Sequence, residues 1–232
     1  MNTSKTKNNR FKSKTSGSSP NRNGRNRNNG RPAGKGRPAS KINVSLLSQK
    51  AKPLHEEVFE AQTTFAEWNL ENSLLRAIEN KNFLKPTEVQ EKTLEPLLAG
   101  KNLIGVARTG TGKTGAFLIP IIHRLLKANK NFNTLVLAPT RELAVQIEEE
   151  FKSLTKGMGL HSACFIGGTN LNKDLNALKK RKHLVVGTPG RLLDLAQRKA
   201  LYFKDFEVLV LDEFDRMLDM GFIHDIKRVM AL

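Results

Sequence analysis

A lysine and a threonine, Lys113 and Thr114, end a glycine-rich stretch whose residue types suit phosphate binding. Gly110 and Gly112 let the backbone wrap closely with its N–H groups pointing inward, and a helical pattern begins at Lys113. Inward N–H groups and a helix N-terminus together form an anion site. The amine of Lys113 would reach the β- and γ-phosphates of a nucleotide, and the Thr114 hydroxyl would hold Mg²⁺.

The residues before this loop give it the context that a phosphate-binding loop needs. The short apolar run Leu103, Ile104 and Val106 predicts a buried strand that leads into the glycines. The loop pattern usually opens on glycine, and Ala107 stands at that place. A glycine-rich turn that binds nothing is the alternative interpretation.

An acidic pair, Asp212 and Glu213, follows the apolar run at residues 207–211 (EVLVL). One carboxylate can hold Mg²⁺, directly or through water, and its neighbour can accept a proton from an attacking water. Alternatively, the two acids only favour the first turn of the next helix.

Strands and helices alternate through the rest of the globular part. Continuous apolar runs predict strands at residues 134–138, 161–166, 183–186 and 207–211, and a helical spacing predicts a last helix over 217–230. This order predicts an α/β fold with a mostly parallel sheet and helices on both faces. Ligands of such sheets bind beyond the carboxyl ends of the strands, where each polar cluster falls.

The charge of the chain divides it into two parts. The sequence has 232 residues and a formal net charge of +17, and fourteen of its lysines and arginines lie in residues 1–52, which contain no acid. This tail has too little apolar surface to fold, so we expect residues 1–60 to be disordered. Its spaced arginines predict salt-sensitive nucleic-acid binding without sequence specificity. A solubilising extension and a general polyanion tether are the alternatives.

The single cysteine, Cys164, lies in an apolar run and is expected to be a small buried hydrophobe. One cysteine cannot form an internal disulfide, so a reducing compartment, the cytoplasm, fits best. No apolar run approaches the length of a membrane span, and the polar N-terminus is not a secretory signal.

Six short motifs in one order carry a resemblance to a known family. They are Phe65 with FLKPTEVQ (83–90), ARTGTGKT (107–114), PTREL (139–143), Gly167-Gly168, TPGR (188–191) and DEFD (212–215). On these motifs the chain resembles the first RecA-like domain of a DEAD-box RNA helicase over about residues 65–215. The resemblance implies a RecA-like P-loop NTPase fold for residues 61–232, ATP and Mg²⁺ as cofactors, and RNA, bound through its backbone, as the partner.

The resemblance also implies a role for each matched residue. Phe65 would stack on adenine, and Gln90, helped by Thr87, would bind the edge of that base. Asp212 would bind Mg²⁺ through water, and Glu213 would be the general base. The phosphates would be held by Arg108, Thr109, Gly110, Thr111, Gly112, Lys113 and Thr114. The RNA backbone would pass along Pro139, Thr140, Arg141, Glu142, Gly168, Thr188, Pro189, Gly190 and Arg191. Arg141 and Arg191 could each instead be a surface or helix-capping charge.

The chain departs from the family pattern at several places. Phe214 replaces the usual Ala, Glu88 replaces Pro, Arg108 replaces Gln and Thr111 replaces Ser. The family's Ser-Ala-Thr motif and its second RecA-like domain, with an arginine finger, are not in this sequence. We therefore expect a truncated helicase that binds ATP weakly, hydrolyses it poorly and does not unwind RNA alone. We also expect a sheet with an open edge and exposed apolar surface.

Two other functions remain open from the sequence. A non-catalytic nucleic-acid-binding fragment could act as a tether or clamp through its basic tail. A DNA-directed helicase relative is the third hypothesis, although Phe65, Gln90 and DEFD favour the RNA family by resemblance.

Overall fold

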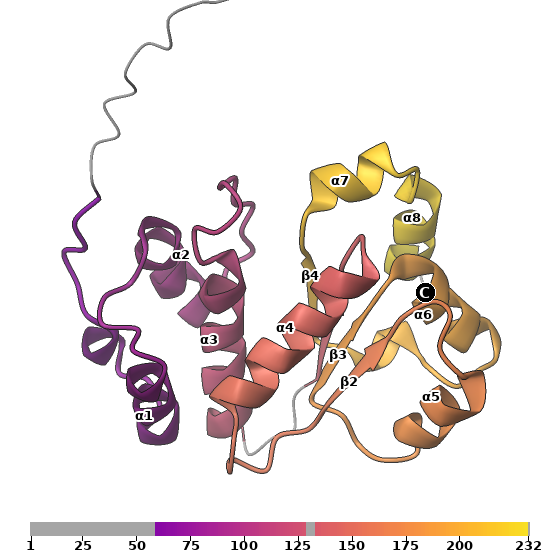
Figure 1. Ribbon diagram of the computed structural model, residues 1–232, viewed down its shortest axis with the longest axis horizontal. Helices are drawn as coiled ribbons and strands as arrows, with labels where there is room; N and C mark the ends of the chain where they lie inside the picture. Colours follow the sequence, from indigo (N-terminus) through magenta and orange to yellow (C-terminus); the bar gives the residue numbers. More distant parts are fainter. Residues whose placement is uncertain (1–58, 129–132, 232) are drawn as a thin grey trace, which may run out of the picture. The chain divides into compact units, whose positions relative to one another are not determined.

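The computed structural model describes residues 59–128 and 133–231, and within them a parallel sheet has the order β2-β3-β1-β4 (Figure 1). The register is parallel at every strand pair. The strands are β1 (Thr134–Leu137), β2 (Ser162–Phe165), β3 (Leu184–Gly187) and β4 (Val208–Leu211). The predicted parallel α/β fold is therefore confirmed. Most of the expected basic tail, residues 1–58, lies outside the described residues.

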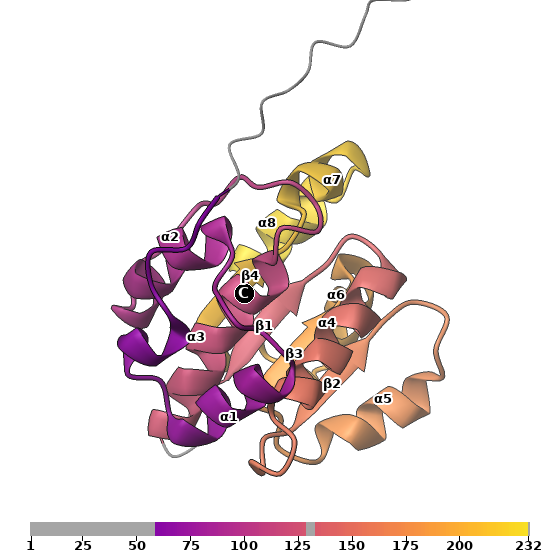
Figure 2. The same ribbon diagram turned by 60° about the vertical axis from the view of Figure 1, so that its left-hand side comes forward.

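Helices cover both faces of the sheet (Figures 1 and 2). Successive strand residues point to opposite faces, so Val136 and Val186 enter one core while Leu135 and Val185 enter the other. The first core is shared with α1 (Asn72–Asn80), α2 (Glu88–Leu98), α3 (Lys113–Lys127), α4 (Arg141–Leu154) and the 3-10 helix η2 (Phe65–Trp68). The second is shared with α5 (Leu171–Leu178), α6 (Pro189–Gln197), α7 (Phe214–Asp219), α8 (Ile223–Ala231) and the 3-10 helix η3 (Phe203–Asp205).

Local sequence signals start three helices next to the expected site. The Thr140 hydroxyl accepts a hydrogen bond from Leu143 N at 3.3 Å and so caps α4. Thr87 precedes α2, and its backbone N–H donates to Gln90 Oε1 at 3.1 Å. Pro189 occupies the first turn of α6, where a missing N–H costs nothing. These caps fix where each chain segment leaves a loop and becomes a helix.

The prediction of a buried strand at Leu103–Val106 is wrong. Residues 101–108 have no regular secondary structure, and the side chains of Ile104 and Val106 are 98% and 100% exposed. A strand requires a neighbour for its backbone N–H and C=O groups, and among the described residues β4 pairs only with β1. The expected open sheet edge is therefore present at β4, where Leu209 is 38% exposed.

The predicted single helix over residues 217–230 is also wrong, because two helices, α7 and α8, occupy this region. Gly221, with φ +80°, lies between them in the left-handed region that favours glycine. The helical spacing of apolar residues continues across Gly221, and for this reason the sequence predicts one helix where the structure has two.

The single cysteine is half-buried, and not fully buried as the sequence predicts. The Cys164 thiol is free, and burial among apolar neighbours raises its pKa to about 12. Its side chain packs against the first core. Over the described ranges, every helix is too short or too polar to cross a membrane.

Candidate functional site

Four polar clusters meet at one edge of the sheet. Residues 139–142 follow β1, residues 167–169 follow β2, residues 188–191 follow β3, and the pair 212–213 follows β4. Because all strand pairs are parallel, their carboxyl ends lie at the same edge. The prediction that these clusters share one edge is therefore confirmed.

The glycine-rich loop ends at the N-terminus of α3 in the expected way. Gly110 and Gly112 have φ values of +80° and +90°, and α3 begins at Lys113. The Thr111 hydroxyl donates to Arg108 O at 2.8 Å, which closes the loop on itself. The Lys113 ammonium donates to Ala107 O at 2.8 Å. An anion that binds here must therefore compete with this carbonyl for the lysine.

Thr87 and Gln90 lie directly against this loop, although they are more than twenty residues away in the sequence. Gln90 is 5% exposed, and its Nε2 donates to Gly112 O at 3.1 Å. A Cβ added at Gly112 would lie 2.8 Å from Gln90 Nε2 and 2.9 Å from Thr87 Oγ1. The structure thus brings the expected adenine-binding pair and the phosphate loop together, with the Gln90 amide bonded to protein atoms.

Phe65 is in the core instead of on an open surface. Its ring is 5% exposed and meets Trp68 edge-on, with 5.9 Å between ring centroids. The ring would have to become accessible before it could stack on a base, so the stacking role stays a prediction.

Asp212 lies near the phosphate loop in a buried position. It is 8% exposed, and its Oδ1 accepts the Glu213 N–H at 3.0 Å. Burial raises the pKa of this carboxyl, while the Glu213 hydrogen bond and the positive charge of Lys113 lower it. Asp212 is therefore a buried acid whose charge is influenced by Lys113 at the end of the phosphate loop.

Glu213 has an unusual backbone conformation. Its φ and ψ are both 50°, in the left-handed region, which costs a non-glycine residue about 1–2 kcal/mol. Its Oε2 lies 3.2 Å from Nη1 of Arg216. Strain of this kind persists where the surrounding structure imposes it, and such places are often functional sites.

The oxygen donors at this edge suit a magnesium ion that also contacts phosphate. In the described ranges, no group of three or more His, Cys, Asp or Glu could hold a metal ion by itself. Mg²⁺ often uses one carboxylate, water and substrate phosphates, and Asp212 and Thr114 offer a carboxylate and a hydroxyl. The residues present therefore fit the ion that the sequence predicts.

The residues expected to bind RNA surround the ends of three adjacent strands, β1, β3 and β2. A Cβ at Gly168 would lie 2.7 Å from Arg141 Nη2, so Arg141 covers the turn after β2. Glu142 and Gly190 are exposed, whereas Pro139 is buried and Thr140 caps α4.

Arg191 does not project freely, because its guanidinium contacts Asp174 and Thr169. Sequence reasoning missed both partners. An acid inside a polar helix and a threonine after a glycine pair carry no pattern that would distinguish them.

A sequence model of the DEAD/DEAH box helicase family matches residues 87–232. The chain is 46% identical over 167 residues to the DEAD-box ATP-dependent RNA helicase CshA of Streptococcus pneumoniae, covering 72% of this chain and 32% of that protein. It is 44% identical over 170 residues to the ATP-dependent rRNA helicase RRP3 of Candida glabrata, covering 73% of this chain and 34% of that protein. The chain thus spans about a third of the length of these curated relatives.

Solved structures show the same likeness. A DEAD box protein from Methanococcus jannaschii superposes with a TM-score of 0.68 at 42% identity, over 72% of this chain and 46% of that one. A hypothetical ATP-dependent RNA helicase from Sulfolobus tokodaii gives a TM-score of 0.65 at 37% identity, over 70% of this chain and 47% of that one.

Proposed function

The chain belongs to the DEAD/DEAH box helicase family, and from this premise we propose that it is the RNA-dependent ATPase module of an ATP-dependent RNA helicase. It binds ATP with Mg²⁺ at the loop before α3 and binds the RNA backbone at the ends of β1, β2 and β3. In a whole helicase, hydrolysis is coupled to the remodelling of RNA duplexes, and this module alone does not unwind RNA. The names of the relatives CshA and RRP3 support the substrate class.

The observation that carries the proposal is the glycine loop, with Gly110 and Gly112 in the left-handed region, that ends on Lys113 at the N-terminus of α3, together with the buried Asp212 that follows β4. A triphosphate needs a cation-binding acid and a lysine facing the same phosphates. In this role the loop amides and Lys113 hold the phosphates, and Thr114 and Asp212 hold the ion. Bound Mg²⁺ would neutralise charge on the phosphate oxygens, and Glu213 would accept a proton from the attacking water.

The RNA-binding part of the proposal is supported by the contiguity of the three strand ends. Backbone N–H groups and arginines contact phosphates without distinguishing the bases. We include in the proposal Pro139, Thr140, Arg141, Glu142, Gly168, Thr188, Pro189, Gly190 and Arg191. The fourteen cations of residues 1–52 add salt-sensitive affinity for nucleic acid. The free thiol of the single cysteine agrees with a cytoplasmic, reducing location.

Titration of the full chain with a fluorescent ATP analogue, with and without Mg²⁺, tests the nucleotide site. Lys113→Ala and Asp212→Asn should each weaken binding about tenfold or more. Binding to the Asp212→Asn variant should no longer depend on Mg²⁺, since this carboxylate holds the ion. Lys127→Ala is the matched control, because this exposed lysine lies at the opposite end of the same helix.

Turnover distinguishes the enzyme from the tether hypothesis. In a version of the chain extended with a second RecA-like domain, phosphate release that RNA stimulates should be lost in Glu213→Gln while ATP affinity stays. A Glu213→Gln variant with the full wild-type rate, or a Lys113→Ala variant with unchanged ATP affinity, would refute the enzymatic proposal.

A further inference from the structure

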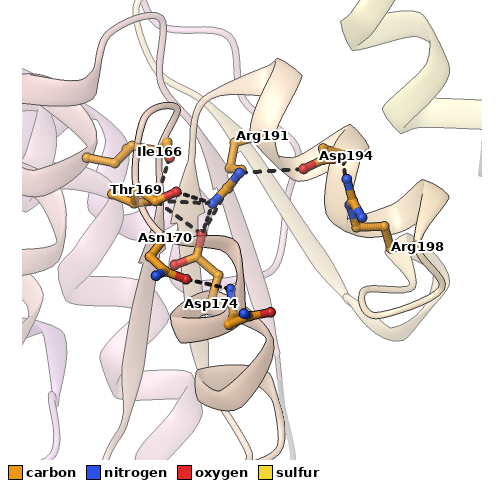
Figure 3. A network of polar contacts seen from close by, with 8 residues as sticks. Ile166, Thr169, Asn170, Asp174, Arg191, Asp194 and Arg198 are labelled. Atoms are coloured by element: carbon orange, nitrogen blue, oxygen red, sulfur yellow. Dashed lines mark hydrogen bonds and ion pairs between the residues drawn. The ribbon is translucent and has the colours of Figure 1, made fainter.

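Arg191 stands in the segment proposed to contact RNA, yet its guanidinium is bound to protein groups (Figure 3). Its Nε donates to Asp174 Oδ2 at 2.9 Å, and its Nη2 lies 2.8 Å from the same oxygen. Nη2 also donates to the backbone oxygen of Thr169 at 2.8 Å. A second acid, Asp194, lies 3.5 Å from Nη1. The guanidinium thus joins α5, α6 and the turn after β2.

The pair formed by Asp174 and Arg191 is largely shielded from water. Their side chains are 11% exposed for Arg191 and 10% for Asp174. A carboxylate and a guanidinium at this depth lose most of their hydration, so each depends on the other as its counter-ion. Removing Arg191 leaves the buried Asp174 carboxylate without this compensation, and removing Asp174 leaves the guanidinium with Asp194 at 3.5 Å.

The turn at residues 167–169 is held from several directions. The Thr169 hydroxyl lies 2.9 Å from Ile166 O and 3.2 Å from Asp174 Oδ2. Asn170 Oδ1 accepts from Asn172 N at 2.9 Å and caps α5 directly after the turn. Above the turn, Arg141 lies against Gly168. Of these groups, the Arg191 guanidinium is the one that bonds to the turn from α6.

We propose that Asp174 and Arg191 form a positioning pair that fixes the turn at residues 167–169 in the shape that receives the RNA backbone. Arg191 then belongs to the RNA-binding edge through this turn, in place of the direct phosphate contact proposed for it above. Asp174, an acid beside a polyanion, therefore strengthens RNA binding. This inference rests on the proposed RNA-binding function of the same edge.

The two roles for Arg191 predict opposite changes in RNA affinity when Asp174 is replaced by alanine. If Arg191 contacts phosphate, Asp174→Ala frees the guanidinium, removes a negative charge and tightens RNA binding. If the pair positions the turn, Asp174→Ala weakens binding by about tenfold, because RNA must then order the turn on binding. Glu149→Gln is the charge control, because it removes an exposed acid from α4 and should bind RNA as the wild type does or slightly more tightly.

The test measures binding of a labelled single-stranded oligouridylate to the full chain and its dependence on salt. A lost phosphate contact lowers the slope of log K against log salt by about 0.7, whereas loss of a positioning residue leaves the slope unchanged. Arg191→Met should therefore weaken binding at constant slope. Arg191→Lys should be weakened almost as much, since an ammonium cannot reach both Asp174 and Thr169. The double variant Asp174→Ala/Arg191→Met should be no worse than either single variant.

Amide hydrogen exchange at residues 166–170, with and without RNA, separates the possible failures. If RNA does not slow the exchange of these amides in the wild type, RNA does not bind at this edge, and the inference fails as well. Protected wild-type amides together with tighter binding by Asp174→Ala, or a reduced salt slope in Arg191→Met, would overturn the positioning role alone. If Asp174→Ala does not fold, Asp174→Asn, which keeps the side-chain shape, replaces it. Weaker RNA binding by this variant supports the positioning role, and tighter binding overturns it.

Discussion

Gly187 and Gly190 lie three residues apart around the turn from β3 into α6, and the structure predicts opposite effects of alanine at them. A Cβ at Gly187 would lie 2.5 Å from the backbone oxygen of Phe165 and 2.9 Å from Leu192 Cγ. The Phe165 oxygen belongs to β2, which pairs with β3 at this position. A backbone atom cannot rotate away as a side chain can, so the two strands must separate.

The expected cost of Gly187→Ala follows from these contacts. Overpacking a buried site costs about 1–3 kcal/mol. The Thr188 N–H donates to the same Phe165 oxygen at 3.1 Å, and weakening this hydrogen bond adds about 1 kcal/mol. The free energy of unfolding should fall by about 2–4 kcal/mol, and the melting temperature by roughly 5–10 °C for a chain of this size.

Gly190→Ala is the matched control. No atom lies within 4 Å of a Cβ at Gly190, and the residue is in the first turn of α6. Alanine there should raise the free energy of unfolding by about 0.5–1 kcal/mol, because it lowers the entropy of the unfolded chain. Urea and thermal unfolding, followed by circular dichroism, measure both variants. The strand-contact reasoning is refuted if the free energy of unfolding of Gly187→Ala lies within about 0.5 kcal/mol of the wild-type value, which is the usual error when independent sites are compared.

Four further predictions concern the site and the thiol. Asp212→Asn should raise the free energy of unfolding at pH 7 by about 1 kcal/mol, since burial raises the pKa of this carboxyl and the charged form weakens the fold. The gain should vanish below the unfolded pKa near 3.8, where both side chains are neutral; equal urea midpoints at pH 7 would contradict this. Gly112→Ala should weaken ATP-analogue binding about tenfold, because the φ of +90° and the close Gln90 and Thr87 atoms exclude a Cβ; unchanged affinity in the same titration would count against it. Cys164, with its pKa raised to about 12, should react with a thiol reagent at pH 8 far more slowly in the native chain than in urea. The contribution of the Cys164 thiol to the free energy of unfolding is present below pH 9 and is lost as pH rises from 9 toward 12. A Cys164→Ala variant should therefore lose less stability than the wild type over that range.

The sheet could be predicted from the sequence because its strands carry strong local signals. The run at residues 134–138 is continuous, apolar and rich in β-branched and leucine residues, and it is the fully buried strand β1. The polar clusters that follow the strands could be placed at one edge because parallel pairing leaves no other arrangement. These conclusions depend on short-range patterns and on one topological rule.

The run Leu103–Val106 shows where such patterns fail. Its apolar residues resemble those of β1, yet they are exposed because among the described residues β4 has no second neighbour. Periodicity reports which side chains prefer burial and does not report whether a partner strand is available. The Asp174–Arg191 pair was missed for a similar reason, since it joins two helices through side chains that sequence spacing cannot relate.

The strand order has a consequence for how the chain is made. The central strand β1 pairs with β3 and β4, both of which follow it in the sequence by a long interval. During synthesis β1 therefore leaves the ribosome well before either partner strand exists. The face of β1 that carries Leu135 and Leu137 stays uncovered while the next segments are translated. Its other face can be sheltered early, because the helices α1, α2 and α3 that share the first core precede β1 and α4 follows it directly. Long-range parallel pairing delays folding in this way, so β1 is the segment for which a nascent-chain chaperone would have the longest access.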